Sequence, residues 1–116
     1  MKKNMEKEFS PSCDRNKQPI LEQLSVYFSN RKNVLEVGSG TGQHAVFFAE
    51  YLPHLIWNTS DMFDYHGSIQ AWMAEATLSN LVSPIEFHFG KNGMDWKYVI
   101  EGIIGIMAVE KTWVKP

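Results

Sequence analysis

Three glycines at alternate positions form the stretch of this sequence that is best suited to chemistry. Gly38, Gly40 and Gly42 stand in the run VLEVGSGTGQH. They directly follow a short apolar segment that carries one acid, Glu36. Glycine lacks a Cβ and tolerates positive φ, so such a loop lets a ligand approach the backbone closely. A helix that begins after the loop adds unpaired N–H groups and a partial positive charge. The run therefore predicts a ligand-binding loop, with a plain strand-to-helix turn as the alternative.

The spacing of the glycines and the nearby acids indicate which ligand the loop holds. The dinucleotide fingerprint is G-x-G-x-x-G, whereas Gln43 stands here where the fingerprint has its third glycine. A carboxylate at Glu36 repels a pyrophosphate and favours a ligand that carries positive charge. Asp61 follows the next apolar run, and its two oxygens can accept both hydroxyls of a ribose. S-adenosyl-L-methionine, which bears an ammonium and a sulfonium, fits this set better than NAD.

Each candidate residue also has a local interpretation. Glu36 can cap backbone amides, and Asp61 can be a turn residue or a helix N-cap. His44 is a candidate general base because histidine titrates near neutral pH, but a histidine in a first helical turn also contacts polar neighbours. Arg15 and Lys17 either form a solvated charge pair or contact a cofactor carboxylate. The four histidines and one cysteine lack metal-ligand spacing, so we expect no metal site.

The elements that position these residues follow from hydrophobic periodicity and capping signals. The sequence predicts a helix that begins near Asn16 or Lys17 with Pro19 in its first turn, strands at 34–37, 55–61 and 84–89, helices at 43–52 and at 68–80 with Ser68 as N-cap, and a fourth strand after Tyr98. Strands that alternate with helices imply an α/β fold with a parallel sheet. Ligands of such sheets bind at the carboxyl ends of the strands, where the glycine loop and Asp61 both fall.

Length and composition indicate a single soluble domain. The chain has 116 residues and a net charge of −2, which gives no concentrated basic surface for nucleic acid or a membrane. We expect residues 1–10 to be a flexible N-terminus and residues 11–116 to form the domain. The N-terminus lacks the apolar region of a secretory signal, and the apolar run at 99–109 is shorter than a membrane span. With a single cysteine, Cys13, the sequence favours a cytoplasmic protein.

Several motifs together resemble a known enzyme family. VLEVGSGTG and the acid after the next strand are similar to motifs I and II of class I S-adenosylmethionine-dependent methyltransferases. More narrowly, SPSCDRNKQPIL, the loop GSGTGQH and SIQAW resemble a small methyltransferase-like family with an R-N-K-x-P-I opening. The resemblance implies cofactor contacts from the loop region and from an N-terminal segment that folds over the site. The residues concerned are Glu36, Gly38, Ser39, Gly40, Gly42, Gln43, His44 and Asp61, together with Arg15, Asn16 and Lys17 of the N-terminal segment.

The resemblance also implies a fold and its limits. It implies a Rossmann-like class I methyltransferase fold that is C-terminally truncated, because members of that class have further strands that build the acceptor pocket. His88 stands where the family has an aspartate suited to the adenine amino group. We expect an S-adenosylmethionine-dependent methyltransferase of unknown acceptor, with a non-catalytic cofactor-binding fragment or a nicotinamide-binding domain as alternatives. An exposed sheet edge would favour a homo-oligomer.

Overall fold

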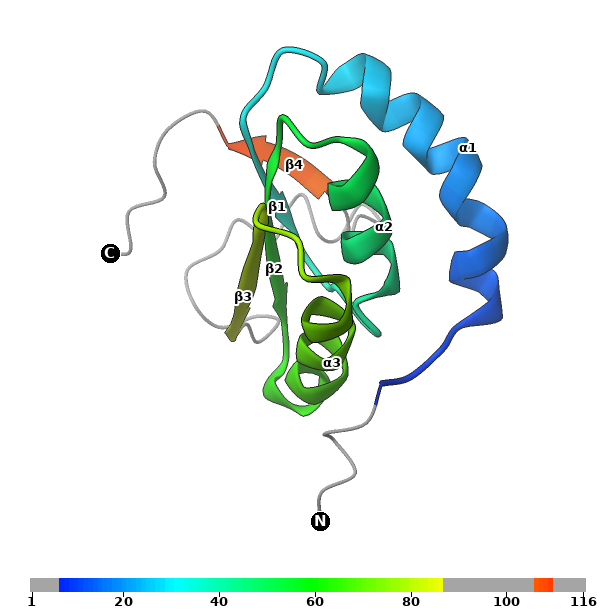
Figure 1. The fold of residues 1–116 in the computed structure, drawn as a ribbon, viewed down its shortest axis with the longest axis vertical. Helices are drawn as coiled ribbons and strands as arrows, with labels where there is room; N and C mark the ends of the chain where they lie inside the picture. Colours follow the sequence, from blue (N-terminus) through cyan, green and yellow to red (C-terminus); the bar gives the residue numbers. More distant parts are fainter. Residues whose placement is uncertain (1–6, 87–105, 110–116) are drawn as a thin grey trace, which may run out of the picture.

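The structure of the protein, a computed structural model, describes residues 7–86 and 106–109. Its elements are α1 (Pro11–Tyr27), β1 (Asn33–Glu36), α2 (Gln43–Tyr51), β2 (Ile56–Asp61), the 3₁₀ helix η2 (Phe63–Tyr65), α3 (His66–Ala76), β3 (Leu81–Glu86) and β4 (Ile106–Val109). Figure 1 shows the helices and strands in space. The alternation of strands and helices confirms the predicted α/β fold.

The four strands form one sheet in the order β3-β2-β1-β4. β1 pairs parallel with β2, and β2 pairs parallel with β3, as the sequence predicts. The strand expected after Tyr98 is present as β4, but it runs antiparallel to β1, so the prediction of a wholly parallel sheet is wrong at this edge. The direction of an edge strand depends on the path of the chain that leads to it, which hydrophobic periodicity does not specify.

The three α-helices lie on one side of the sheet (Figure 1). Right-handed crossovers from β1 to β2 and from β2 to β3 place α2 and α3 on the same face. The buried apolar core between helices and sheet consists of Leu24, Val34, Ala45, Phe48, Ala49, Leu52, Leu55 and Trp57. The ring centroids of Phe48 and Trp57 are 5.5 Å apart, so the helix that follows the glycine loop is anchored over β2.

The start of α1 differs from the prediction. The helix begins at Pro11 with Ser10 as N-cap, and the Ser10 Oγ accepts the N–H of Cys13. Pro19 lies inside the helix rather than in its first turn. Because Pro19 is exposed, water can replace the hydrogen bond that its missing N–H would make. Ser10–Pro11 was the stronger signal, since serine at the cap followed by proline is a favoured helix start.

The elements α3 and β3 also begin earlier than predicted. α3 begins at His66, so Ser68 lies within the helix and is not its N-cap. β3 begins at Leu81 and contains Pro84, which the prediction had at the start of the strand. The pairing of β3 with β2 is irregular, as expected where a proline removes a donor from the hydrogen-bond ladder.

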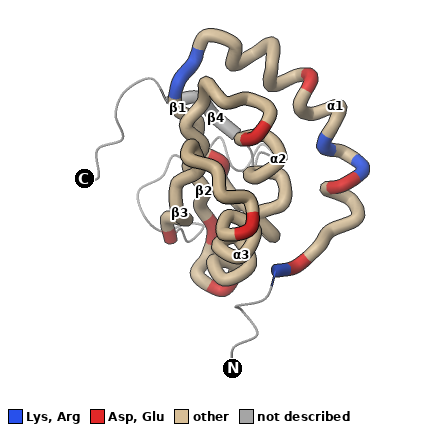
Figure 2. The backbone as a smooth tube through the Cα atoms, in the orientation of Figure 1, with Lys and Arg blue, Asp and Glu red and all other residues tan. Residues whose placement is uncertain are grey.

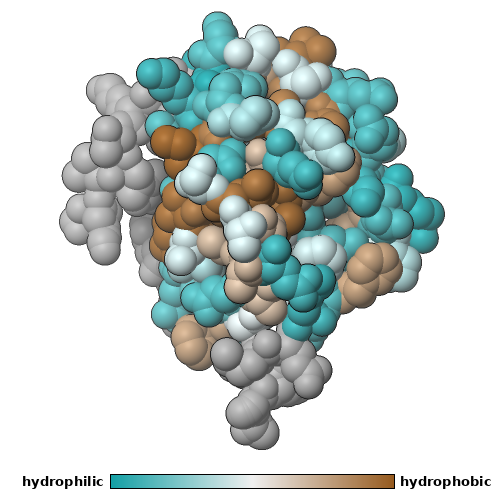
Figure 3. All heavy atoms as spheres, viewed as in Figure 1, coloured by the Kyte–Doolittle hydropathy of each residue, from teal (hydrophilic) through white to brown (hydrophobic). Residues whose placement is uncertain are grey.

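Part of the apolar surface lies on the strands. Val82 and Ile85 on β3 are 37% and 38% exposed, and Ile56 on β2 is 43% exposed. Figure 3 shows apolar surface (brown) in the middle of the face that is seen in Figure 1. β3 is the last strand at its edge of the described sheet, and an edge strand of this kind is where another chain can pair. The homo-oligomer stays a prediction. Within residues 7–86 and 106–109, no helix combines the length and apolarity that crossing a bilayer requires.

Candidate functional site at the carboxyl edge of the sheet

The glycine loop, residues 38–42, connects the carboxyl end of β1 to the first turn of α2. Its three glycines all have positive φ, at 82°, 60° and 97° in chain order. The N–H groups of Gly38 and Ser39 both donate to the carbonyl of Ser60, at 3.0 and 2.8 Å, which joins the loop to β2. Only glycine adopts such angles readily, so the alternate glycines are a requirement of the backbone.

Gly40 and Gly42 differ in what surrounds them. A Cβ on Gly42 would lie 2.7 Å from the Cα of Ile69, because α3 packs closely against the start of α2 at this point. A Cβ on Gly40 would meet no atom within 4 Å. Gly42 is therefore required for packing, whereas Gly40 leaves open space in which a ligand can reach the backbone.

Asp61 ends β2 and supports the glycine loop. Its Oδ2 accepts the N–H of Gly40 at 2.8 Å, and its Oδ1 accepts the N–H of Met62 at 2.7 Å. Each carboxylate oxygen has further lone-pair capacity, so Asp61 can still accept hydroxyl groups of a ligand. Asp61, which we predicted to bind a ribose, therefore also has the turn role that we gave as its alternative interpretation.

Glu36 ends β1 and is 5% exposed. The indole Nε1–H of Trp57 donates to its Oε1 at 3.1 Å. Burial raises the pKa of Glu36 to about 7; hydrogen bonds from Trp57 and Ser39 partly oppose this shift, and the charge of Asp61 adds to it. Near neutral pH the carboxyl group is therefore divided between its two protonation states. A cation bound beside Glu36 would favour the carboxylate.

A third acid, Glu86, stands at the same edge of the sheet and was not predicted from the sequence. Glu86 is the last residue of β3 and pairs in register with Asp61. Each of the three parallel strands thus ends in an acid. The predicted third strand, 84–89, included His88 near its end, and residues 87–89 lie outside the described residues. The register of β3 against β2 places Glu86 next to Asp61.

Acidic and basic residues are unevenly distributed along the chain. Between residues 33 and 86 the acids are Glu36, Glu50, Asp61, Asp64, Glu75 and Glu86, and no lysine or arginine occurs. The basic residues of the described chain lie in α1 and in the segments that flank it (Figure 2). A surface of this kind opposes a polyphosphate ligand and favours a ligand with positive charge. This one-sided distribution of charge is visible in the sequence and, like Glu36, favours a ligand with positive charge.

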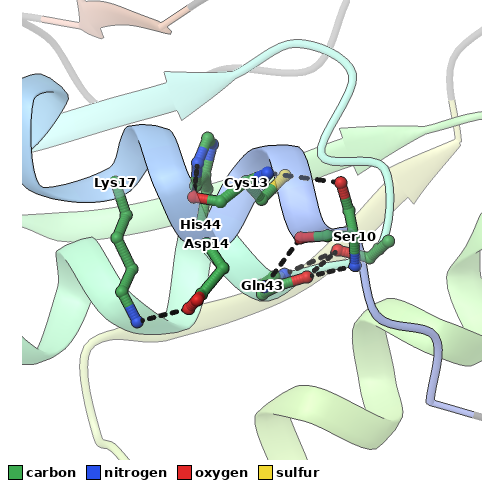
Figure 4. A network of polar contacts seen from close by, with 7 residues as sticks. Ser10, Cys13, Asp14, Lys17, Gln43 and His44 are labelled. Atoms are coloured by element: carbon green, nitrogen blue, oxygen red, sulfur yellow. Dashed lines mark hydrogen bonds and ion pairs between the residues drawn. The ribbon is translucent and has the colours of Figure 1, made fainter.

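Gln43 and His44 stand in the first turn of α2, but both point toward the N-terminal part of the chain (Figure 4). The Gln43 Oε1 accepts the N–H of Ser10 at 2.8 Å, and its Nε2 donates to the carbonyl of Ser10 at 3.3 Å. The His44 Nε2 lies 3.2 Å from the carbonyl oxygen of Cys13, so this nitrogen is the donor. Burial lowers the pKa of His44, with a further contribution from the charge of Lys17. A neutral His44 therefore links α1 to α2. This contact agrees with the alternative to a general base, in which His44 contacts polar neighbours.

Arg15, Asn16 and Lys17 lie on α1. The Lys17 Nζ pairs with Asp14 at 2.9 Å and lies 4.8 Å from the centroid of the Phe47 ring. An Arg15 guanidinium nitrogen lies 3.4 Å from the Ser12 Oγ, and both Arg15 and Asn16 are exposed. These contacts of Arg15 and Lys17 are with α1 and α2 and do not reach the glycine loop. Lys17 is therefore charge-paired with Asp14 on α1, whereas Arg15 contacts the uncharged hydroxyl of Ser12.

The segment before α1, residues 7–10, lies across α2 and α3, and we call it the N-terminal strap. The Glu8 N–H donates to the Ser68 Oγ at 2.9 Å, and the Glu8 carbonyl accepts the Trp72 Nε1–H at 2.7 Å. The roles of Ser68 and Trp72 were not predicted, since both residues fit the apolar and capping pattern of a helix. Contacts between residues 60 or more positions apart leave no periodic signal in a single sequence.

Residues 7–112 match the family described as "Protein of unknown function (DUF938)". The matched region includes the N-terminal strap, the glycine loop and the acids at the ends of β1, β2 and β3. In the described residues, no group of histidine, cysteine, aspartate or glutamate side chains is arranged to hold a metal ion.

Proposed function

Since the chain belongs to this family, whose description names no activity, we propose from the site itself that the protein binds S-adenosylmethionine and transfers its methyl group to an acceptor. The proposal includes a Rossmann-like methyltransferase fold. The observation that carries it is the buried acid Glu36, which lies with Asp61 beside a glycine loop that is open at Gly40. The acids fit a cationic nucleoside cofactor, and the open glycine admits it to the backbone.

Three groups on this edge match three parts of the cofactor. Glu36 offers a carboxylate for the ammonium of the methionine part of the cofactor. The N–H groups at the start of α2 can bind the carboxylate of the same methionine part. Asp61 retains acceptor capacity for the ribose hydroxyls. Glu86, the neighbour of Asp61 in the sheet, can accept the adenine amino group, the role that the resemblance gives to an aspartate at the position of His88. Bound there, the cofactor supplies a methyl group on a sulfonium, and the protein contributes mainly by positioning the acceptor.

A nicotinamide dinucleotide fits the same edge less well. Its pyrophosphate would lie in a region that has six acids and no lysine or arginine between residues 33 and 86. Gln43, at the position of the third fingerprint glycine, holds Ser10 through both ends of its amide group. The third glycine of that fingerprint permits close packing of a helix on a strand, whereas the close contact at Gly42 is with Ile69 of α3.

Titration calorimetry with S-adenosylmethionine, S-adenosylhomocysteine and NAD tests the proposal. We expect both sulfur nucleosides to bind and NAD to bind at least tenfold more weakly. Asp61→Asn should weaken binding of S-adenosylhomocysteine at least tenfold, because a charged acceptor for two hydroxyls is lost. NAD binding without binding of either sulfur nucleoside would overturn the proposal.

Asp64→Asn is the matched control for this experiment. Asp64 is an exposed acid three positions away on η2, and the substitution makes the same change in charge and size. We expect its affinity for S-adenosylhomocysteine to stay within twofold of the wild type. Thermal unfolding of both variants separates a binding defect from a loss of folded protein.

Methyl transfer is the second half of the proposal. Labelled S-adenosylmethionine, incubated with the protein and fractionated cell extract, should yield a labelled product that Asp61→Asn reduces in step with its loss of affinity. Cofactor binding without transfer to any fraction would favour the non-catalytic cofactor-binding protein that was the alternative prediction.

A further inference from the structure

The N-terminal strap is held through its backbone at every second residue. Side chains of α3 hold the N–H and carbonyl of Glu8, and Gln43 of α2 holds the N–H and carbonyl of Ser10. No side chain of Glu8 or Phe9 takes part in these four hydrogen bonds, and Phe9 is 61% exposed. A few hydrogen bonds of this kind contribute modestly to stability, so the strap can open at a much lower cost than unfolding the domain.

Two of the three side chains that hold the strap also contact the glycine loop. The Ser68 Oγ accepts the Glu8 N–H and donates to the carbonyl of Thr41 at 2.8 Å. The Gln43 Oε1 accepts the Ser10 N–H at 2.8 Å and the Thr41 hydroxyl at 3.4 Å. Thr41 lies between Gly40 and Gly42, so a shift of the loop changes Ser68 and Gln43, two of the three side chains that hold the strap. These contacts form a continuous physical connection of the kind that can carry energetic coupling between two sites.

Charge also draws the strap to this position. The Lys7 ammonium lies 4.0 Å from the centroid of the Trp72 ring and pairs with Glu75. The chain between residues 33 and 86 contributes no lysine or arginine to that surface. The contact is partly exposed, so it guides the strap more than it stabilises it.

We propose that the N-terminal strap is a closing segment of the site, so that its docking on Ser68 and Gln43 and the binding of a ligand at the glycine loop strengthen each other. The proposal rests on the proposed function in taking S-adenosylhomocysteine as the ligand. The proposed coupling between strap and loop through Thr41 can be tested without a ligand. A coupling of this kind is reciprocal, because each event must change the other by the same factor.

Hydrogen exchange of single amides, followed by NMR on the full chain, measures strap docking directly. The amides of Glu8 and Ser10 report on it, because Ser68 and Gln43 are their acceptors. We expect saturating S-adenosylhomocysteine to slow both amides by about threefold to tenfold, a range typical of one hydrogen bond. Trp72→Phe removes the donor to the Glu8 carbonyl and should weaken binding of S-adenosylhomocysteine by a similar factor. Glu75→Gln, which removes only the exposed ion pair, is the control and should change affinity less than twofold.

Thr41→Val tests the coupling without any ligand. It removes the hydroxyl that contacts Gln43 but keeps the shape of the side chain, and that hydroxyl makes its hydrogen bonds with Gln43 rather than with the strap. We expect the Ser10 amide to exchange at least threefold faster in this variant, and unchanged exchange would overturn the coupling. If S-adenosylhomocysteine binds the wild type but leaves both amides and the Trp72→Phe affinity unchanged, the strap proposal is wrong and the proposed function stands. If S-adenosylhomocysteine does not bind, the proposed function fails and the Thr41→Val result alone decides the coupling.

Discussion

The glycine loop and the N-terminal strap contact the same two side chains, Gln43 and Ser68, but they are held in different ways. The loop takes its shape from three glycines with positive φ, and its N–H groups meet acceptors at the end of β2. The strap has no such backbone requirement and is held by side chains that are 33 to 64 residues away in the sequence. A local requirement of the backbone can be read from residue types, whereas a docked segment depends on where other elements pack.

Among the substitutions that distinguish the glycine loop from the strap, Gly42→Ala should have the largest effect on stability. Gly42→Ala places a Cβ at φ 97° and 2.7 Å from the Cα of Ile69. Left-handed strain and overpacking together should lower the free energy of unfolding by about 3 kcal/mol or more. Gly40→Ala has the strain without the collision and should cost about 1 kcal/mol. Urea unfolding of both variants measures the difference, and equal losses would contradict the distinction between a packing glycine and an open one.

Glu36→Gln should show how strongly the stability of the loop region depends on pH. The folded protein raises the pKa of Glu36 from 4.5 to about 7, so the folded state holds the proton more tightly than the unfolded chain. The contribution of Glu36 to stability is therefore fully present below pH 4.5 and is lost as the pH rises through about 7. The wild type should lose about 3 kcal/mol over this window relative to its value at low pH.

Glutamine keeps an oxygen that can accept the Trp57 N–H, so Glu36→Gln removes the titration and retains this hydrogen bond. We expect the difference in unfolding free energy between variant and wild type to shift in favour of the variant as the pH rises from about 5 to about 8. Denaturation at closely spaced pH values records this shift. A difference that stays constant across the window would show that Glu36 does not titrate there.

The smallest effect is expected at the junction of the strap with α1. Ser10→Ala removes the Oγ that caps the Cys13 N–H but keeps the backbone of Ser10 that Gln43 holds. Loss of an N-cap should cost about 1 kcal/mol. Ser12→Ala, two residues along on the exposed surface, is the control and should change stability by less than about 0.5 kcal/mol. Equal effects in thermal unfolding would mean that the cap adds nothing beyond the strap contacts.

Sequence patterns predicted the centre of the site better than its margins. The loop and Asp61 were found because glycines at a strand end and an acid after the next strand are local signals. Glu86 was missed because its position beside Asp61 depends on the register of β3, whose predicted start was displaced from Leu81 to Pro84. His44 was considered as a base from its residue type alone, and the structure instead gives it a contact with Cys13.

The α/β alternation, the positive-φ loop and the acids at the ends of β1 and β2 can all be derived from the sequence without a structure. These features follow from the periods of helices and strands and from the conformational freedom of glycine, which act within a few residues. The fold in three dimensions was needed to find that Glu36 is desolvated beside Trp57, that β4 is antiparallel and that the strap meets the glycine loop at Gln43 and Ser68. Burial, strand direction and docking all depend on which distant segments come together, and in a single sequence that information is spread over the whole chain.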